Sequence, residues 1–103
     1  METIIIKLDS KKLENPDLDI LYDLPDRIAE YTGNKVTDNG YDYLSDTELA
    51  VWLAAEDAEK AYGGIVELLK KEKFCDNDLS ATAEIYVSGE ANADISKCRK
   101  VYP

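Results

Sequence analysis

The sequence predicts an α+β fold, namely a ferredoxin-like βαββαβ sandwich in which a four-stranded antiparallel sheet carries two helices on one face. Segments with strand-like alternation and segments with helical periodicity follow one another in that order. The 103 residues are 45% hydrophobic, enough for one modest core, and include only three prolines and five glycines, which argues against disorder. We therefore expect a single domain over residues 1–103, with residues 89–103 forming either an added edge strand or a mobile tail.

The first part of the chain predicts a central strand, a loop and a short helix. Residues Thr3–Leu8 are β-branched and mostly apolar, which is typical of a strand buried on both faces. Residues 9–16 are polar and contain an Asn-Pro dipeptide, a loop signal. Because proline inside a helix loses a hydrogen bond and clashes one turn back, we place a helix over Pro25–Thr32 and an irregular or one-turn segment over Leu18–Leu24.

An Asn-Gly pair follows, between two short polar flanks. Asn39-Gly40 supplies the positive φ angles of a tight turn, so Lys35–Thr37 and Tyr41–Tyr43 are predicted to form a hairpin about Asp38–Gly40. An edge strand with a bulge at Gly40 is the competing account.

Residues Glu48–Ala55 are ambiguous between strand and helix. The pattern Ser45-x-x-Glu48 fits a helix capping box, and the alanines favour a helix from Asp46 to Tyr62. Leucine and valine nevertheless alternate onto one face, and a second helix start follows at residues 56–57. We therefore predict a strand.

The second half predicts a helix from Asp57 and a final strand. Acidic residues at the start of this helix and lysines at its end match the helix dipole, and we interpret Gly63-Gly64 as close packing against the sheet. After a loop at residues 76–78, alternation from Ala81 to Val87 predicts a half-buried strand. Trp52 and Tyr86 would then point to the open face, away from the helices.

The charge is distributed unevenly along the chain. The formal net charge is −10, from 22 acidic and 12 basic residues. Between Leu13 and Glu59 there are 13 acids against only Arg27 and Lys35, a net of −11, whereas the remaining residues carry +1. Such a field repels nucleic acid and anionic membranes and attracts cationic partners, at rates that salt suppresses. The alternative is that the acids only keep the protein soluble.

Several kinds of chemistry are excluded or disfavoured. The chain has no histidine, the usual general base and the commonest metal ligand, so histidine-dependent nucleophile systems are excluded and no metal or cofactor is expected. The stretch from Asp38 fails as a calcium loop, with Tyr43 where glycine is required and Leu49 where the closing glutamate belongs. Phosphate-binding glycine motifs are missing, and an RNA-binding sheet would need a basic platform.

No apolar run is long enough to span a bilayer, and the N-terminal residues do not match a signal peptide. We therefore expect a cytoplasmic location. Cys75 and Cys98 should then be free thiols.

What remains is a recognition surface of acids and tyrosines. Tyrosine gives a large contact area for little entropy loss, and carboxylates pair with arginine and lysine. The candidate partner-binding residues are Asp17, Asp19, Asp23, Asp38, Tyr41, Asp42, Tyr43, Asp46 and Trp52.

In size, charge and composition the chain resembles small acidic bacterial inhibitors, such as immunity proteins and inhibitors that imitate the charge of DNA. The resemblance implies a non-enzymatic protein that blocks a basic partner, such as a nuclease or toxin, without itself binding nucleic acid or membrane. The alternative is a ferredoxin-like ligand-binding or regulatory domain that acts as a homodimer. An enzyme using carboxylates or tyrosine as acid and base is the third hypothesis.

Overall fold

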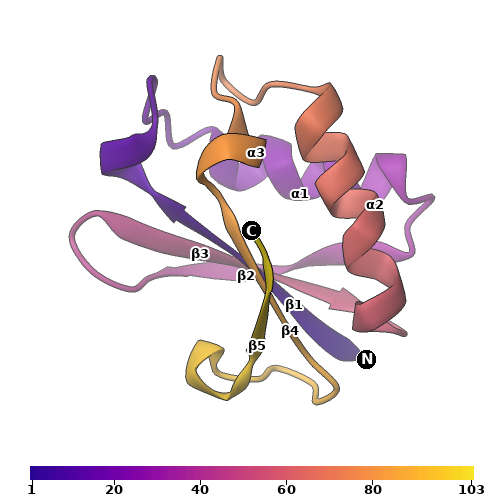
Figure 1. The fold of residues 1–103 in the computed structure, drawn as a ribbon. Helices are drawn as coiled ribbons and strands as arrows, with labels where there is room; N and C mark the ends of the chain where they lie inside the picture. The colour runs from indigo at the N-terminus through magenta and orange to yellow at the C-terminus, as the bar shows by residue number, and fades with distance from the viewer.

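The computed structural model describes residues 1–103 and has an α+β architecture, with a five-stranded antiparallel sheet and three helices (Figure 1). The strand order is β2-β3-β1-β4-β5. The elements are β1 (Glu2–Asp9), the 3-10 turn η1 (Ser10–Lys12), α1 (Ile20–Tyr31), β2 (Val36–Tyr43), β3 (Glu48–Ala55), α2 (Ala58–Lys71), α3 (Leu79–Thr82), β4 (Glu84–Ser88), the 3-10 turn η2 (Ile95–Lys97) and β5 (Arg99–Tyr102).

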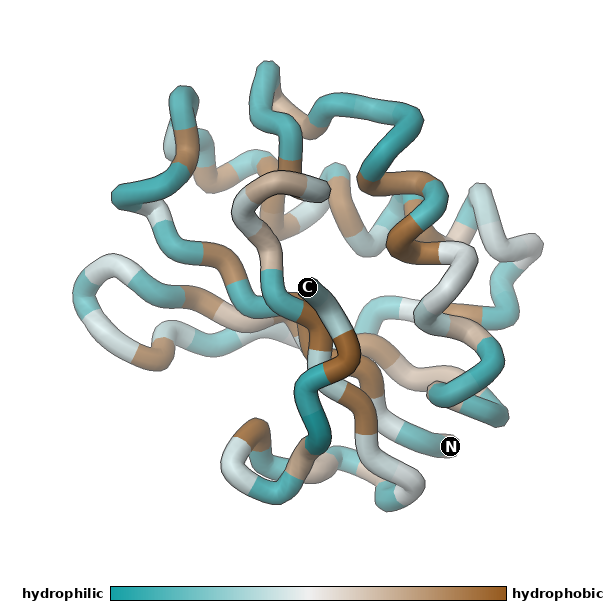
Figure 2. Tube along the Cα trace, in the orientation of Figure 1, coloured by the Kyte–Doolittle hydropathy of each residue, from teal (hydrophilic) through white to brown (hydrophobic).

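β1 is the central strand, as its sequence predicts. It pairs along its whole length with β3 on one side and over Thr3–Lys7 with β4 on the other. Ile4, Ile5 and Ile6 are all fully buried, because both faces of β1 are covered. Hydrophobic stretches accordingly concentrate in the central strands, while the outer loops are mostly hydrophilic (Figure 2).

The main core lies between one face of the sheet and the two longer helices. Every second residue of β1 and β3 packs there, together with the buried stripes of α1 and α2. Bidentate hydrogen bonds from Arg27 of α1 to Glu72, at 2.9 and 2.5 Å, tie the first helix to the end of the second. The predicted placement of both helices on one face is therefore seen in the structure.

The predicted start of the first helix is wrong. α1 begins at Ile20, so Pro25 lies inside it rather than in its first turn. Proline in a helix interior costs about 3 kcal/mol relative to alanine. Here Leu21, Leu24, Pro25 and Ile28 are all buried against the sheet, and this burial outweighs the lost hydrogen bond.

The hairpin predicted about residues 38–40 is also wrong, and the competing account of a bulged edge strand is confirmed. β2 runs continuously from Val36 to Tyr43, with a register shift against β3 between Asp38 and Tyr41. Gly40 has φ of 97° at this irregularity. The chain reverses instead at residues 44–47, where the Ser45 hydroxyl accepts the Glu48 backbone N–H at 3.1 Å. The capping-box pattern therefore stabilises a turn between strands.

The predictions for Glu48–Ala55 and for the second helix are confirmed. β3 has the predicted bounds, and Leu49, Val51 and Leu53 face the core. The Asp57 side chain caps α2 by accepting the Lys60 N–H at 3.2 Å. The interpretation of Gly63-Gly64 as close packing is wrong, because a Cβ at either position would meet no atom within 4 Å.

The last part of the chain differs from the predicted single strand. Residues 79–82 form the one-turn helix α3, capped by the Asp78 side chain, and β4 starts only at Glu84. Residues 99–102 add the edge strand β5 beside β4, so the sheet has five strands rather than the predicted four.

The sheet face opposite the helices is partly covered rather than open. The segment between β4 and β5 crosses it (Figure 1), and the Trp52 indole N–H donates to the Ala93 carbonyl at 2.9 Å. The Thr3 hydroxyl donates to the Glu90 carbonyl at 2.7 Å and accepts the Ala93 N–H at 3.1 Å. Trp52 and Tyr86 flank Ile5 in register, so these three side chains lie together on this face of the sheet.

Candidate partner-binding pocket and tyrosine surface

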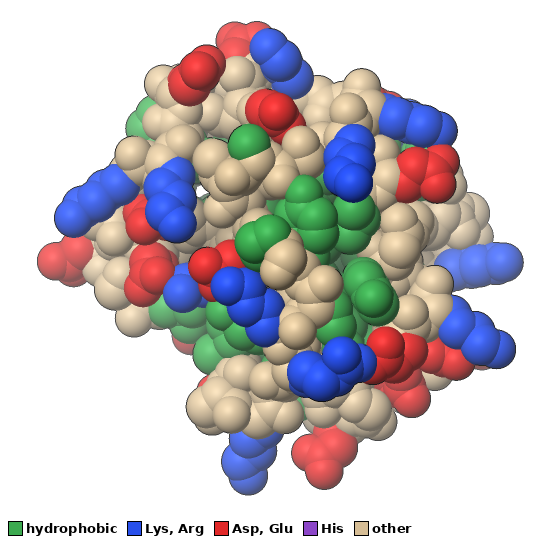
Figure 3. Space-filling view, viewed as in Figure 1, with side chains coloured by type: hydrophobic (Ala, Val, Ile, Leu, Met, Phe, Trp, Pro, Cys, Tyr) green, Lys and Arg blue, Asp and Glu red, His purple; other side chains and the backbone are tan.

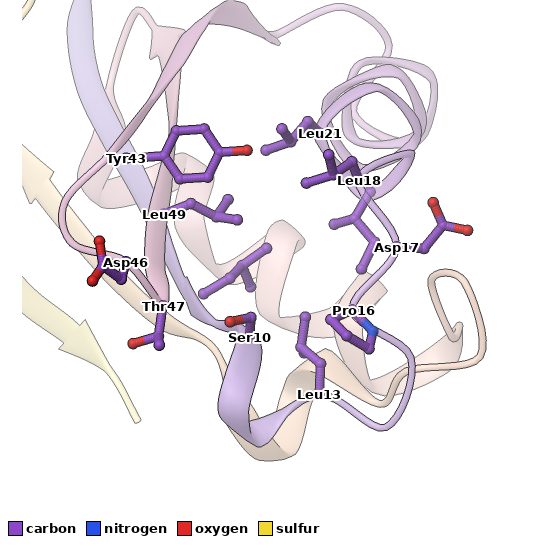
Figure 4. A pocket seen from close by; sticks show the side chains of 12 residues that line it. Ser10, Leu13, Pro16, Asp17, Leu18, Leu21, Tyr43, Asp46, Thr47 and Leu49 are labelled. Carbon is purple, nitrogen blue, oxygen red and sulfur yellow. The ribbon is translucent and has the colours of Figure 1, made fainter.

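An apolar pocket of about 150 Å³ lies between the segment before α1 and the β2–β3 turn (Figure 4). Leu49 forms part of its floor, Leu13 and Pro16 lie on one side, Leu18 comes from the segment just before α1, and Leu21 comes from the first turn of α1. The ring of Tyr43 reaches over from the end of β2 toward Leu18 and Leu21. The full lining is Leu8, Ser10, Leu13, Pro16, Asp17, Leu18, Ile20, Leu21, Tyr43, Asp46, Thr47 and Leu49.

One wall of the pocket is a loop that a buried amide holds in place. The Asn77 side chain accepts the Asn15 backbone N–H at 2.8 Å and donates to the Asn15 carbonyl at 2.6 Å. It also donates to the Phe74 carbonyl at 3.1 Å. Because Asn77 is buried, these bonds fix residues 13–16 against the 74–78 loop and so fix the pocket wall.

Three exposed tyrosines gather beside the pocket. Tyr41 and Tyr43 lie in register with the core residues Val51 and Leu49, which places them on the helix-bearing side of β2. Their rings meet edge to face, with centroids 6.5 Å apart. Tyr22 of α1 lies beside Tyr41, whose phenol raises the pKa of Tyr22, with smaller contributions from burial, Asp19 and Tyr43. The exposed fractions of Tyr22, Tyr41 and Tyr43 are 59%, 47% and 52%.

Aspartates surround this surface without basic partners. Asp17 and Asp46 line the pocket mouth, and their carboxylates point away from its centre (Figure 4). Asp19 and Asp23 lie at the start of α1, where acidic side chains also favour the helix dipole. None of these four carboxylates forms an ion pair with a lysine or arginine. Their negative charge is therefore available to a partner.

Some other acids of the same sequence block have basic partners within the chain. Glu48 pairs with Lys7 at 2.8 Å, and Glu59 pairs with Arg99 of β5. Arg27, one of the two bases in the block, is occupied by Glu72. On the face that carries β5 and the C-terminus, basic and acidic side chains lie interspersed around an apolar area (Figure 3). The four aspartates near the tyrosines thus keep an unpaired negative charge, as do Glu14, Asp26 and Glu56 elsewhere in the block.

Some predicted site residues have local backbone roles. Asp17 accepts the N–H of Asp19 at 2.9 Å, Asp38 accepts that of Gly40 at 3.0 Å, and Asp42 accepts that of Tyr43 at 2.8 Å. Hydrogen bonds of this kind shape turns and bulges, which is the structural explanation for aspartate at these positions.

The structure does not bring all the predicted residues together. Asp42 lies in register with Ala50, on the sheet face opposite Tyr41 and Tyr43, and Trp52 lies on that same opposite face beneath Ala93. Asp38, in register with the core residue Leu53, is exposed before the bulge and does not line the pocket. Asp17, Tyr43 and Asp46 line the pocket, and Asp19 and Tyr41 lie beside Tyr22 at its edge. Asp23 lies with Asp17 and Asp19 around Cys75, in a neighbouring hollow that also contains Arg27 and Lys73.

Sequence reasoning missed the apolar part of the site. Leu18 is 58% exposed at the pocket mouth, and Leu13 is half-buried in its wall. The available signal was the occurrence of leucines and proline among acids over residues 13–18. Tyr22, one of the tyrosines within the acidic part of the sequence, lies on α1 and is part of the surface.

The cysteine thiols and the acidic side chains near the pocket give no sign of a reactive or metal-binding site. Cys75 lies 3.7 Å from the Asp23 carboxylate, and burial followed by Asp17 and Asp23 raises the pKa of this thiol. Both cysteines are free, as predicted. No group of three or more potential ligating side chains is arranged to hold a metal ion.

Comparison with family models, curated proteins and solved structures finds no match to this chain. No helix is both long and apolar enough to cross a bilayer.

Proposed function

We propose that this chain is a non-enzymatic recognition protein that binds a basic protein partner and blocks it. The observation that carries this proposal is the juxtaposition of Tyr22, Tyr41 and Tyr43, all about half exposed, with aspartates that no lysine or arginine of the chain neutralises.

The chemistry of this surface suits a cationic protein. Tyrosines are enriched at protein interfaces and cluster among the residues that dominate binding energy. Unpaired carboxylates increase the association rate with positively charged surfaces and form charge-assisted hydrogen bonds with arginine and lysine. A basic groove that normally handles nucleic acid offers such a surface, so the partner we favour is a nuclease or related toxin, as for an immunity-type inhibitor. The carboxylates would then take the place of phosphates.

We also propose that the fold is ferredoxin-like and that the protein is cytoplasmic. The order β1-α1-β2-β3-α2-β4, with β1 between β3 and β4, supports a ferredoxin-like unit extended by β5. A cytoplasmic location fits the free cysteines.

A pull-down from the extract of the source cells tests the function. The wild type should retain a basic protein at low salt and release it at high salt. The variant D19N/D23N/D46N should bind that protein about tenfold more weakly, because each lost charge pair contributes about 0.5 kcal/mol. The matched control E56Q/D76N/E90Q changes the net charge equally, at exposed positions away from the pocket, and should bind nearly as the wild type does.

Two outcomes would contradict the proposal. One is the recovery of no basic protein. The other is equal weakening by the two triple variants, which would assign the effect to net charge rather than to this surface.

Gly63-Gly64 and Trp52 are the features that would favour the alternative of a homodimeric ligand-binding domain. The glycines have open space around them, and the Trp52 indole N–H is occupied by Ala93. Sizing with a thermal-shift ligand screen separates the two functions, since a dimer stabilised by one metabolite class would favour the alternative.

A further inference from the structure

The apolar pocket has the dimensions of a site for one side chain. Its volume is about 150 Å³. An engineered cavity of about this volume, lined by leucine, isoleucine and phenylalanine, holds a benzene molecule. The pocket therefore has room for a single ring or branched aliphatic group, but not for a larger ligand such as a dinucleotide.

The lining and the mouth of the pocket differ in character. Inside are mainly leucines, with Leu49 and Leu21 buried, whereas Leu18 and Tyr43 at the mouth are more than half exposed. An apolar group seated there would cover these two side chains from water, which favours binding.

The mouth is negative and contains no cation. Asp17 and Asp46 belong to different segments and lie on different sides of the pocket (Figure 4). No lysine or arginine lines it. A ligand with positive charges on both sides of an apolar group would therefore match both the pocket and its rim.

We infer that the pocket receives one large apolar side chain, of phenylalanine or leucine size, from a short segment of the partner in which lysine or arginine flanks that side chain. The inference rests on the proposed function and specifies how the basic partner is anchored. Exposed tyrosines beside the pocket extend the contact. The charges attract the segment, and the apolar anchor fixes its position.

Synthetic peptides test this directly, with binding followed by NMR titration of the isotope-labelled full chain. The probe is Lys-Lys-Gly-Phe-Gly-Lys-Lys; one comparison peptide has serine in place of phenylalanine, and another has glutamine in place of every lysine. The phenylalanine probe should shift the amide signals of residues 17–21 and 43–49. It should also bind about tenfold more tightly than either comparison peptide.

Protein variants supply the second part of the experiment. T47L adds apolar bulk to the pocket lining, and L18Q removes an exposed apolar wall; each should reduce the advantage of phenylalanine over serine to less than about threefold. T37L, at a half-buried position on the opposite face of β2, is the matched control and should retain the full advantage.

The failures of the two proposals are distinguishable. Equal binding of the phenylalanine and serine peptides would overturn the pocket inference while leaving a charge-based docking surface. Equal binding of the lysine and glutamine peptides would overturn the basic flanks, and no binding of any peptide would overturn the inference as a whole. Failure of the pull-down, by contrast, contradicts the proposed function whatever the peptides do.

Discussion

Asn77 joins two loops whose residues lie 62 positions apart in the sequence. Its amide is buried and satisfied on both sides, by the Asn15 backbone and by carbonyls of its own loop. In the sequence, Asn77 within Asp-Asn-Asp predicts only a turn. Its role in joining the two loops is apparent only in the folded structure, where the loops are adjacent. The pocket wall depends on it.

We predict that N77L destabilises the fold by about 2–3 kcal/mol, because the Asn15 N–H and the loop carbonyls lose the buried amide that pairs with them. Urea unfolding followed by Trp52 fluorescence measures the change. N39A is the control, since Asn39 is exposed and bonds only to Asn92 at 2.7 Å; it should change stability by less than about 0.5 kcal/mol. Similar losses in both variants would contradict the role given to Asn77.

Glu84 gives a residue-scale prediction for pH. The Tyr86 hydroxyl donates to Glu84 at 2.6 Å, and Lys7 and Lys100 lie 3.8 and 3.7 Å away. These partners, Tyr86 first, lower the pKa of Glu84 below its usual 4.5. A lowered folded-state pKa contributes stability that is present above the unfolded-state value and is lost as pH falls through the folded-state value.

E84Q should therefore be less stable than the wild type at pH 7, by about 1 kcal/mol or less, and this difference should shrink as pH is lowered from 4.5 toward 3. Urea titrations at pH 7, 5 and 3 measure it. E90Q, which removes a carboxylate without an ion pair, should show little difference at any pH. An E84Q deficit that stays constant from pH 7 to 3 would refute the assignment.

At the scale of elements, the bulge in β2 decides how the tyrosine surface is built. The register shift between Asp38 and Tyr41 places Tyr41 and Tyr43 on the helix-bearing side, while Asp42 points to the other side. Gly40, with φ of 97°, makes this shift possible without strain.

The same substitution should have opposite signs at two glycines. G40A should cost about 1 kcal/mol or more, because alanine disfavours positive φ, whereas G64A should stabilise α2 by about 0.5–1 kcal/mol. Neither new Cβ meets an atom within 4 Å, so the comparison isolates backbone conformation. Thermal unfolding of both variants measures the effects; stabilisation by G40A would contradict the bulge geometry.

At the scale of the whole molecule, the net charge of −10 opposes compaction. The protein measures 32 × 28 × 22 Å, close to the Debye length of about 30 Å at 10 mM ionic strength. Repulsion among its acids is therefore barely screened in dilute buffer.

Raising NaCl from about 10 to 200 mM should increase Tm by a few degrees, as expected for a gain below about 1 kcal/mol. Differential scanning calorimetry measures this. The E56Q/D76N/E90Q variant carries less net charge and should respond less. A decrease in Tm with salt would mean that the ion pairs outweigh the repulsion.

The sequence by itself determined the β1 and β3 strands, the α2 helix and the acidic character of residues 13–59. Hydrophobic periodicity and charge are local properties that survive any arrangement of the elements. Tertiary structure decided the start of α1, since burial of its apolar stripe outweighs the cost of Pro25. It also decided that α3 precedes β4, that β5 completes the sheet, and which acids remain unpaired. The pocket and its tyrosines depend on contacts between segments distant in sequence, and those contacts exist only when the sheet and α1 pack together.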